Sequence, residues 1–200
     1  MDASEAKEEY WDLYNQRDQF VRTMKRGEGF VPPYLYHNTV EVIPTDFAGH
    51  MLITQRSAAK RRGAGKWEFP AGSVLSGEKI QNAAKRELWE ETGLGATKIT
   101  RIQVRRIPGM QRSIYFAYIP SLLTARIRLQ EGETQAYKII TVPQWLTMIA
   151  SNEFDAERVR LYDTSLFDAA VKQVGITMEP APKNSAPKKK QTASFPAAKK

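Results

Sequence analysis

Three glutamates, Glu87, Glu90 and Glu91, lie close together in a segment of helical composition. Their i, i+3, i+4 spacing places the three carboxylates on one face of a helix, where like charges repel. The macrodipole disfavours negative charge further at a helix C-terminus. A divalent cation removes both penalties, because Mg2+ and Mn2+ prefer oxygen ligands. The spacing therefore predicts a metal site formed by Glu87, Glu90 and Glu91, although an isolated pattern of this kind is also typical of a solvated helical face.

The residues around this cluster predict a loop, a helix and a defined helix end. Gly72 marks the loop, and the helical run opens at Glu78. Apolar residues recur every four positions along this run, which gives it a stripe that can pack on a sheet. The residues of this stripe are Ile80, Ala84 and Leu88. Gly93 follows the last turn, where a helix C-cap belongs.

Residues 72–94, GSVLSGEKIQNAAKRELWEETGL, contain every fixed position of the pattern G-x5-E-x7-R-E-U-x-E-E-x-G-U, with U aliphatic. The chain therefore resembles the Nudix hydrolases. The resemblance implies an α/β fold, the α/β/α sandwich of that family with a mixed sheet. It also implies an ion pair in which Arg86 orients a glutamate of the box. Four positions would support the site structurally: Gly72, Glu78, Arg86 and Gly93.

The chemistry implied by the resemblance is metal-dependent hydrolysis of a diphosphate linkage in a nucleotide. Cations held by the glutamates would neutralise phosphate charge and lower the pKa of a bound water. Attack of water on one phosphorus then expels the other phosphate, with a carboxylate as general base. Because family members place the base differently, Glu87, Glu91 and Glu133 are all candidates. Glu133 precedes a predicted strand outside the box, and Glu131 is the alternative to it.

Basic residues before the box are candidates for binding substrate phosphates. Arg56, Arg61 and Lys66 lie in the segment that leads to the box, where cations can hold distal phosphates. The alternative is a solvated loop that needs charge. A second basic group flanks a predicted turn at residues 108–109 and could line the same cleft. Its members are Arg105, Arg106 and Arg112.

Two narrower resemblances bear on the reaction. Residues 9–29 resemble the start of isopentenyl-diphosphate-isomerase-like Nudix proteins, which implies an N-terminal β-hairpin extension. Those isomerases use a cysteine and a histidine where this chain has Ala71 and Gly72, so isomerase activity is not expected. Residues 52–72 resemble the signature of coenzyme A pyrophosphatases, but Trp67 is the residue of generic Nudix sequences. Coenzyme A pyrophosphatase activity therefore remains an alternative, as does a non-catalytic Nudix protein that binds nucleotide or RNA.

Composition favours one folded domain between two extensions. The 200 residues are 42% hydrophobic, which is enough for a single core. The chain contains no cysteine, its N-terminus is acidic and polar, and no apolar run is long enough to cross a membrane. We therefore expect a cytoplasmic protein without membrane association. Its expected divisions are an extension over 1–35, a Nudix domain over 36–178 and a tail over 179–200.

The tail, residues 179–200, carries six lysines and one glutamate of a chain with net charge +8. Rich in Pro, Ala, Lys and Ser, it is expected to be disordered. Its charge would allow contact with nucleic acid, but a solubilising tail without a specific partner is our preferred interpretation. The sequence leaves a homodimer open and contains no feature that demands one.

Hydrophobic patterning predicts the remaining elements of the domain. The expected strands are 38–43, 51–55, 113–119 and 137–142. A short helix is expected over 143–150, where Pro143 can occupy the first turn. A longer helix is expected over 155–174, with its apolar positions in the core.

Overall fold

The computed structural model describes residues 8–163 together with 166, 168 and 172. Within this part of the chain, no helix is both long and apolar enough to cross a membrane. The elements of the described chain are, in order, β1 (Tyr10–Tyr14), β2 (Phe20–Lys25), β3 (Tyr36–Thr45), β4 (His50–Arg56), β5 (Trp67–Glu68), β6 (Ala71–Ser73), α1 (Ile80–Thr92), β7 (Lys98–Ile107), β8 (Gly109–Tyr118), β9 (Thr134–Thr141), α2 (Val142–Ala150) and α3 (Ala156–Val159).

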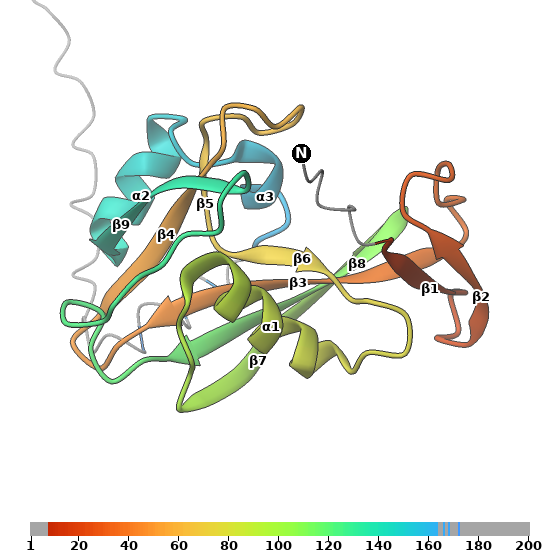
Figure 1. Ribbon diagram of the computed structural model, residues 1–200, viewed down its shortest axis with the longest axis horizontal. Helices are drawn as coiled ribbons and strands as arrows, with labels where there is room; N and C mark the ends of the chain where they lie inside the picture. The colour runs from red at the N-terminus through yellow and green to blue at the C-terminus, as the bar shows by residue number, and fades with distance from the viewer. Residues whose placement is uncertain (1–7, 164–165, 167, 169–171, 173–200) are drawn as a thin grey trace, which may run out of the picture.

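The strands form one mixed sheet around β3 (Figure 1). β3 runs parallel to β8 and antiparallel to β1, β4 and β6. β4 continues the sheet through β5 and β9, and β7 pairs with β8 as a hairpin. β1 and β2 pair antiparallel as the hairpin at the N-terminal end. The mixed sheet and the N-terminal hairpin predicted from the sequence are therefore confirmed.

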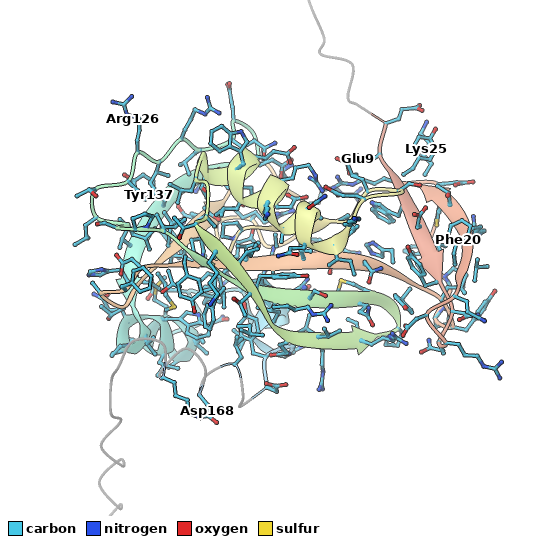
Figure 2. The ribbon with its side chains drawn as sticks, turned by 90° about the horizontal axis from the view of Figure 1, so that it is seen from below. Glu9, Phe20, Lys25, Arg126, Tyr137 and Asp168 are labelled. Carbon is cyan, nitrogen blue, oxygen red and sulfur yellow. The ribbon has the colours of Figure 1, made fainter. Side chains whose placement is uncertain are left out.

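Two hydrophobic cores lie on opposite faces of this sheet. Because successive side chains of a strand point to opposite faces, the neighbours Val42 and Ile43 of β3 belong to different cores. Val42 packs in the core that contains Leu88 of α1, and Ile43 in the core that contains Trp145 of α2. Figure 2 shows α1 and α2 on the two sides of the sheet. This layering confirms the predicted α/β/α sandwich.

The box helix has the predicted stripe and the predicted end. Ala84 and Leu88 of α1 are buried against the sheet. Gly93 caps the helix with φ 70°, a left-handed conformation that glycine adopts at little cost. Its N–H donates to the carbonyl of Trp89 over 2.8 Å. The helix therefore ends directly after its glutamates, so these residues lie next to the loop that follows α1.

The helix predicted over 155–174 is wrong as one continuous element. α3 ends at Val159, and residues 162–163 are not helical. Leu166 is again helical and buried, but most of the remaining segment lies outside the described residues. The interruption places Tyr162 in the core, where its hydroxyl donates a hydrogen bond to the buried carboxylate of Glu41. This tertiary contact overrides the helical periodicity of the sequence.

Candidate active site

The three box glutamates occupy different environments at the C-terminal half of α1. The Glu87 side chain is 12% exposed and that of Glu90 is 42% exposed, while Glu91 is buried at 8%. All three border one cavity of about 240 Å³ between α1, β6 and the loop before β9. The structure therefore brings the predicted metal-binding glutamates to one pocket.

Strand β6 approaches Glu87 so closely that only a glycine fits at its centre. A Cβ built on Gly72 would lie 2.0 Å from Oε1 of Glu87. Gly72 pairs with Val40 of β3, so the strand is held at this distance by the sheet. The predicted supporting role of Gly72 thus has a steric basis, which is space for a carboxylate.

Arg86 lies between the two carboxylates that point away from the core. Its Nη1 is 2.7 Å from Oε1 of Glu87 and 3.0 Å from Oε2 of Glu90. Its Nε and Nη2 bind both oxygens of Glu78 at 3.0 and 2.9 Å, and Nη2 also donates to the carbonyl of Ser73 over 2.9 Å. Burial opposes the charge, but these carboxylates raise the pKa of Arg86 above its ordinary value. Arg86 therefore joins Glu78 at the helix start to the glutamates of the pocket.

Glu91 is the most deeply buried acid of the box. The N–H of Ala71 donates to its Oε1 over 3.2 Å, whereas Oε2 is buried without a hydrogen-bond partner among the described residues. Burial raises the pKa of Glu91 to about 8. Burial also raises the pKa of Glu87, against the influence of Arg86. Glu87 has Arg86 as its counter-charge, whereas Oε2 of Glu91 lacks the partner that a buried carboxylate requires.

These features fit a divalent cation. The pocket offers hard oxygen donors and one buried oxygen without a partner among the described residues. Among the described residues no three acids or histidines stand close enough to hold an ion directly. Arg86 is instead the counter-charge of Glu87 and Glu90, so binding a cation requires their carboxylates to turn from it.

Glu133 borders the same cavity, and Glu131 does not. Glu133 forms an ion pair with Lys60, and its carbonyl accepts a hydrogen bond from the N–H of Ser57 over 2.8 Å. Glu131 is exposed. Of the two loop acids considered from the sequence, the structure therefore brings Glu133 to the box glutamates.

The predicted phosphate-binding cations are divided by the fold. Arg56 borders the glutamate cavity and a neighbouring cavity of about 530 Å³. Lys66 borders only the neighbouring cavity, and Arg61 is exposed and borders neither. In the second basic group, Arg112 borders both cavities, whereas Arg106 forms an ion pair with Asp18 elsewhere.

Sequence reasoning missed a buried charge cluster beside the pocket. Glu41 and Glu68 are almost fully buried, and they face the guanidinium groups of Arg56, Arg112 and Arg158. Glu41 lies at the centre of the apolar run of β3. An acid within an apolar strand indicates a buried ion pair, because a buried carboxylate needs a partner. Its partners come from β8 and α3, so the sequence alone does not identify them.

The N-terminal hairpin contacts the box directly. Asp12 of β1 accepts hydrogen bonds from the Ser76 hydroxyl over 2.7 Å and from the Gly77 N–H over 2.9 Å. Glu9 and Arg26, which form an ion pair, border the glutamate cavity. In Figure 2, Glu9 and Lys25 lie together at the end of the hairpin that faces α1. The extension is therefore part of the wall of the pocket.

The pocket therefore combines carboxylates, which are ligands that divalent cations prefer, with arginines, which can pair with phosphates. The model of the NUDIX domain matches residues 35–162. The chain belongs to the Nudix family. Proteins of this family generally use divalent cations.

Curated relatives support the same assignment over parts of the chain. An uncharacterized Nudix hydrolase of Listeria monocytogenes is 38% identical over 88 residues, 43% of this chain and 52% of the relative. Nudix hydrolase 2 of Arabidopsis thaliana is 26% identical over 137 residues, 65% of this chain and 49% of the relative. An RNA pyrophosphohydrolase of Actinobacillus pleuropneumoniae is 41% identical over 59 residues, 30% and 26% of the two chains. The chain spans about half the length of the first two relatives.

Solved structures share the fold. A crystal structure from Deinococcus radiodurans matches with a TM-score of 0.64 at 21% identity, covering 78% of this chain and all of the other. A MutT protein from Methanosarcina mazei matches with a TM-score of 0.51 at 22% identity, covering 72% of this chain and 96% of the other. At these identities the likeness shows the fold alone.

Proposed function

We propose that the protein is a metal-dependent pyrophosphohydrolase that cleaves the diphosphate linkage of a nucleoside diphosphate derivative. The observation that carries this proposal is the convergence of Glu87, Glu90 and Glu91 on a pocket that is also lined by arginines. Mg2+ or Mn2+, when bound to these carboxylates, would neutralise phosphate charge and activate water. The combination of oxygen ligands and arginines matches a substrate with two adjacent phosphates.

Each residue of the pocket has a proposed task. Glu87, Glu90 and Glu91 hold the cations, and Arg86 pairs with Glu87 and Glu90 in the cation-free pocket and releases them when the cations bind. Arg56 neutralises substrate phosphate, as a guanidinium can do with two parallel hydrogen bonds.

The general base takes the proton of the attacking water, and three carboxylates border the pocket in which that water must lie. Burial raises the pKa of both Glu87 and Glu91, which makes each carboxylate, once deprotonated, a stronger base. Glu133 can accept a proton once it turns from Lys60.

Incubation of the purified protein with Mg2+ and a panel of diphosphate compounds tests this proposal, with products identified by mass spectrometry. The panel contains ADP-ribose, NADH, coenzyme A, dinucleoside polyphosphates, nucleoside triphosphates and prenyl diphosphates. Cleavage of a member between two phosphates, and its loss in Glu90→Gln, is the expected result. The absence of any cleavage by a protein that binds Mg2+ would contradict the proposal and favour a non-catalytic binding role.

The coenzyme A alternative loses support from the position of Arg61. Arg61 lies in residues 52–72, the segment that resembles coenzyme A pyrophosphatases, and it is exposed and borders neither cavity. The panel decides the point, because release of a 4′-phosphopantetheine product identifies that activity directly.

A second candidate substrate is the 5′ end of RNA. It is favoured by the relatives named RNA pyrophosphohydrolase and by the charge of residues 179–200, which lie outside the described residues. A chain ending at Met178 should cleave mononucleotides as the full chain does. If RNA is the substrate, the shortened chain should bind RNA more weakly, and equal binding by both would remove the tail from this role.

A further inference from the structure

Three arginines that line the glutamate cavity, here called the arginine wall, lie beside two buried acids. Arg56 binds Glu68 at 3.2 Å, and Arg112 binds Glu41 at 3.0 Å. Arg158 lies between these acids, 2.5 Å from Glu68 and 3.6 Å from Glu41. Arg158 also interacts with Glu91, so these arginines join the buried acids to the glutamates of the pocket. Guanidinium groups stay charged in proteins, and they can hold an anion such as a phosphate through charge-assisted hydrogen bonds.

Arg56 is the most exposed arginine of this wall. It donates through Nη1 to Glu68 and through Nε to the carbonyl of Arg62 over 2.9 Å, and its side chain is 28% exposed, compared with 13% for Arg112. Nε of Arg112 is buried without an acceptor among the described residues, so it does not itself face the cavity. An anion in the cavity can therefore receive a charge-assisted hydrogen bond from Arg56 and is attracted by the charge of the other two arginines.

The three arginines are the boundary between the glutamate cavity and the neighbouring cavity of about 530 Å³. Arg56, Arg112 and Arg158 are the residues that border both. A third cavity, of about 710 Å³ beside Tyr36 and Gln111, borders none of the three arginines. A phosphate at the wall can therefore extend in one direction toward the glutamates and in the other into the neighbouring cavity.

The neighbouring cavity has the size and lining of a ligand pocket. Its volume is within the range of roughly 300–1,000 Å³ that small-molecule sites occupy. Ile107, Met110 and Leu161 give it an apolar part, and Asn152 and Asp155 give it polar groups at its edge. A flat ring with hydrogen-bonding edges, such as a nucleobase, matches this combination.

We propose that Arg56, Arg112 and Arg158 bind the phosphate attached to the nucleoside, and that the nucleoside itself occupies the 530 Å³ cavity. The second phosphate and any group attached to it then lie at the glutamates, in the smaller and more polar cavity. Hydrolysis adds water across the P–O–P linkage, so one product is a nucleoside monophosphate that remains at the arginines. This inference rests on the proposed function and adds that the protein recognises its substrate through the nucleoside and the phosphate attached to it.

Binding of nucleoside monophosphates without divalent cations tests the inference independently of catalysis. Isothermal titration calorimetry in EDTA with AMP, GMP, CMP and UMP, with the matching nucleosides and with inorganic phosphate, measures the affinities. We expect at least one monophosphate to bind more tightly than its nucleoside and than phosphate. Arg112→Gln and Arg56→Gln should each weaken this binding by about tenfold, the effect of one lost charge-assisted interaction of roughly 1.4 kcal/mol.

Arg106→Gln is the matched control, because Arg106 forms its ion pair with Asp18 and borders neither the arginine wall nor the 530 Å³ cavity. It should leave the affinity unchanged. Thermal unfolding of each variant shows whether it still folds. If Arg112→Gln is unstable, Arg56→Gln serves as the test on its own, because Glu68 keeps its ion pair with Arg158 in that variant.

The outcomes separate the inference from the proposed function. Equal affinity for nucleoside and monophosphate, or equal affinity of wild type and both arginine variants, would overturn the inference even if the protein cleaves diphosphates. Monophosphate binding that depends on the arginines, in a protein that cleaves no diphosphate, would retain the binding site and overturn the proposed function.

Discussion

The carboxylate of Glu87 occupies the space that a Cβ on residue 72 would need. A Cβ on Gly72 would lie 2.0 Å from Oε1 of Glu87. The φ of Gly72 is not in the left-handed region, whereas Gly93 caps α1 with φ 70°. The box therefore uses its glycines for two different physical reasons. Gly72 provides room for a side chain, and Gly93 provides a backbone conformation.

Gly72→Ala should displace Glu87 and weaken cation binding while the fold persists. The clash involves the flexible end of a side chain, so we expect a loss of stability of about 1–3 kcal/mol. Mn2+ affinity measured by calorimetry should fall together with kcat. Gly95→Ala is the control, because a Cβ at Gly95 meets no atom within 4 Å. Equal Mn2+ affinity of the two variants would show that the position of Glu87 does not matter.

Glu91→Gln should separate catalysis from stability. The substitution keeps the shape of the side chain and removes a buried carboxylate whose Oε2 has no partner among the described residues. We expect an unchanged or raised unfolding midpoint in EDTA, with kcat lowered roughly a hundredfold or more. Glu131→Gln, at an exposed acid outside the pocket, should change neither quantity. A fully active Glu91→Gln would exclude Glu91 both as metal ligand and as base.

The features that depend on neighbouring residues in the chain, such as the helical face of the glutamates and the end of α1, were predictable from the sequence. The spacing of Glu87, Glu90 and Glu91 specifies one helical face, and a glycine after the last turn specifies the helix end. The strand β7 was missed, because its sequence is rich in cations and its side chains are mostly exposed. Its buried residue, Gln103, is polar and donates to the carbonyl of Leu161 over 2.7 Å. Hydrophobic periodicity does not predict a strand whose buried side chain is a hydrogen-bonded glutamine.

Long-range charge pairs were the other part that the sequence did not reveal. Arg158 meets Glu41 and Glu68 because α3 returns to the centre of the sheet, and these three residues are far apart along the chain. The same return explains why the predicted helix 155–174 is interrupted at Tyr162. Local periodicity favoured a continuous helix, and burial of Tyr162 beside Glu41 decided against it.

Asp12→Ala, a substitution in the N-terminal hairpin, should lower both the stability and the kcat of the protein. Asp12 accepts hydrogen bonds from Ser76, Gly77 and Thr23, and it thereby holds the loop that leads to Glu78. Loss of these bonds to a charged group should cost about 1–3 kcal/mol of unfolding free energy. Because Glu78 anchors Arg86, kcat should fall as well, whereas KM should change little.

Thr23→Ala is the matched control for Asp12, since it removes one of these bonds and leaves those to the box loop. It should reduce stability less than Asp12→Ala and leave kcat unchanged. Identical kinetic behaviour of the two variants would indicate that the hairpin stabilises the fold without positioning the box.

His37 should make the folded state sensitive to acid. Its ring stacks on Trp11 with centroids 4.2 Å apart, and its Nδ1 is buried without a hydrogen-bond partner among the described residues. Burial, and secondarily the charge of Arg26, lower the pKa of His37 from 6.5 to about 4. The ring of His37 is therefore held by stacking on Trp11.

The sign of the effect follows from which state binds the proton. Between pH 6.5 and about 4 the unfolded chain takes up a proton at His37 that the folded chain does not, so stability is complete above pH 6.5 and falls as the pH decreases through this window. The largest loss from this group is about 3 kcal/mol. His37→Phe keeps an aromatic ring against Trp11 and removes the titration. Chemical denaturation between pH 8 and 4 should therefore give a wild-type free energy of unfolding that declines more steeply than that of His37→Phe, and parallel curves would show that His37 is protonated equally in both states.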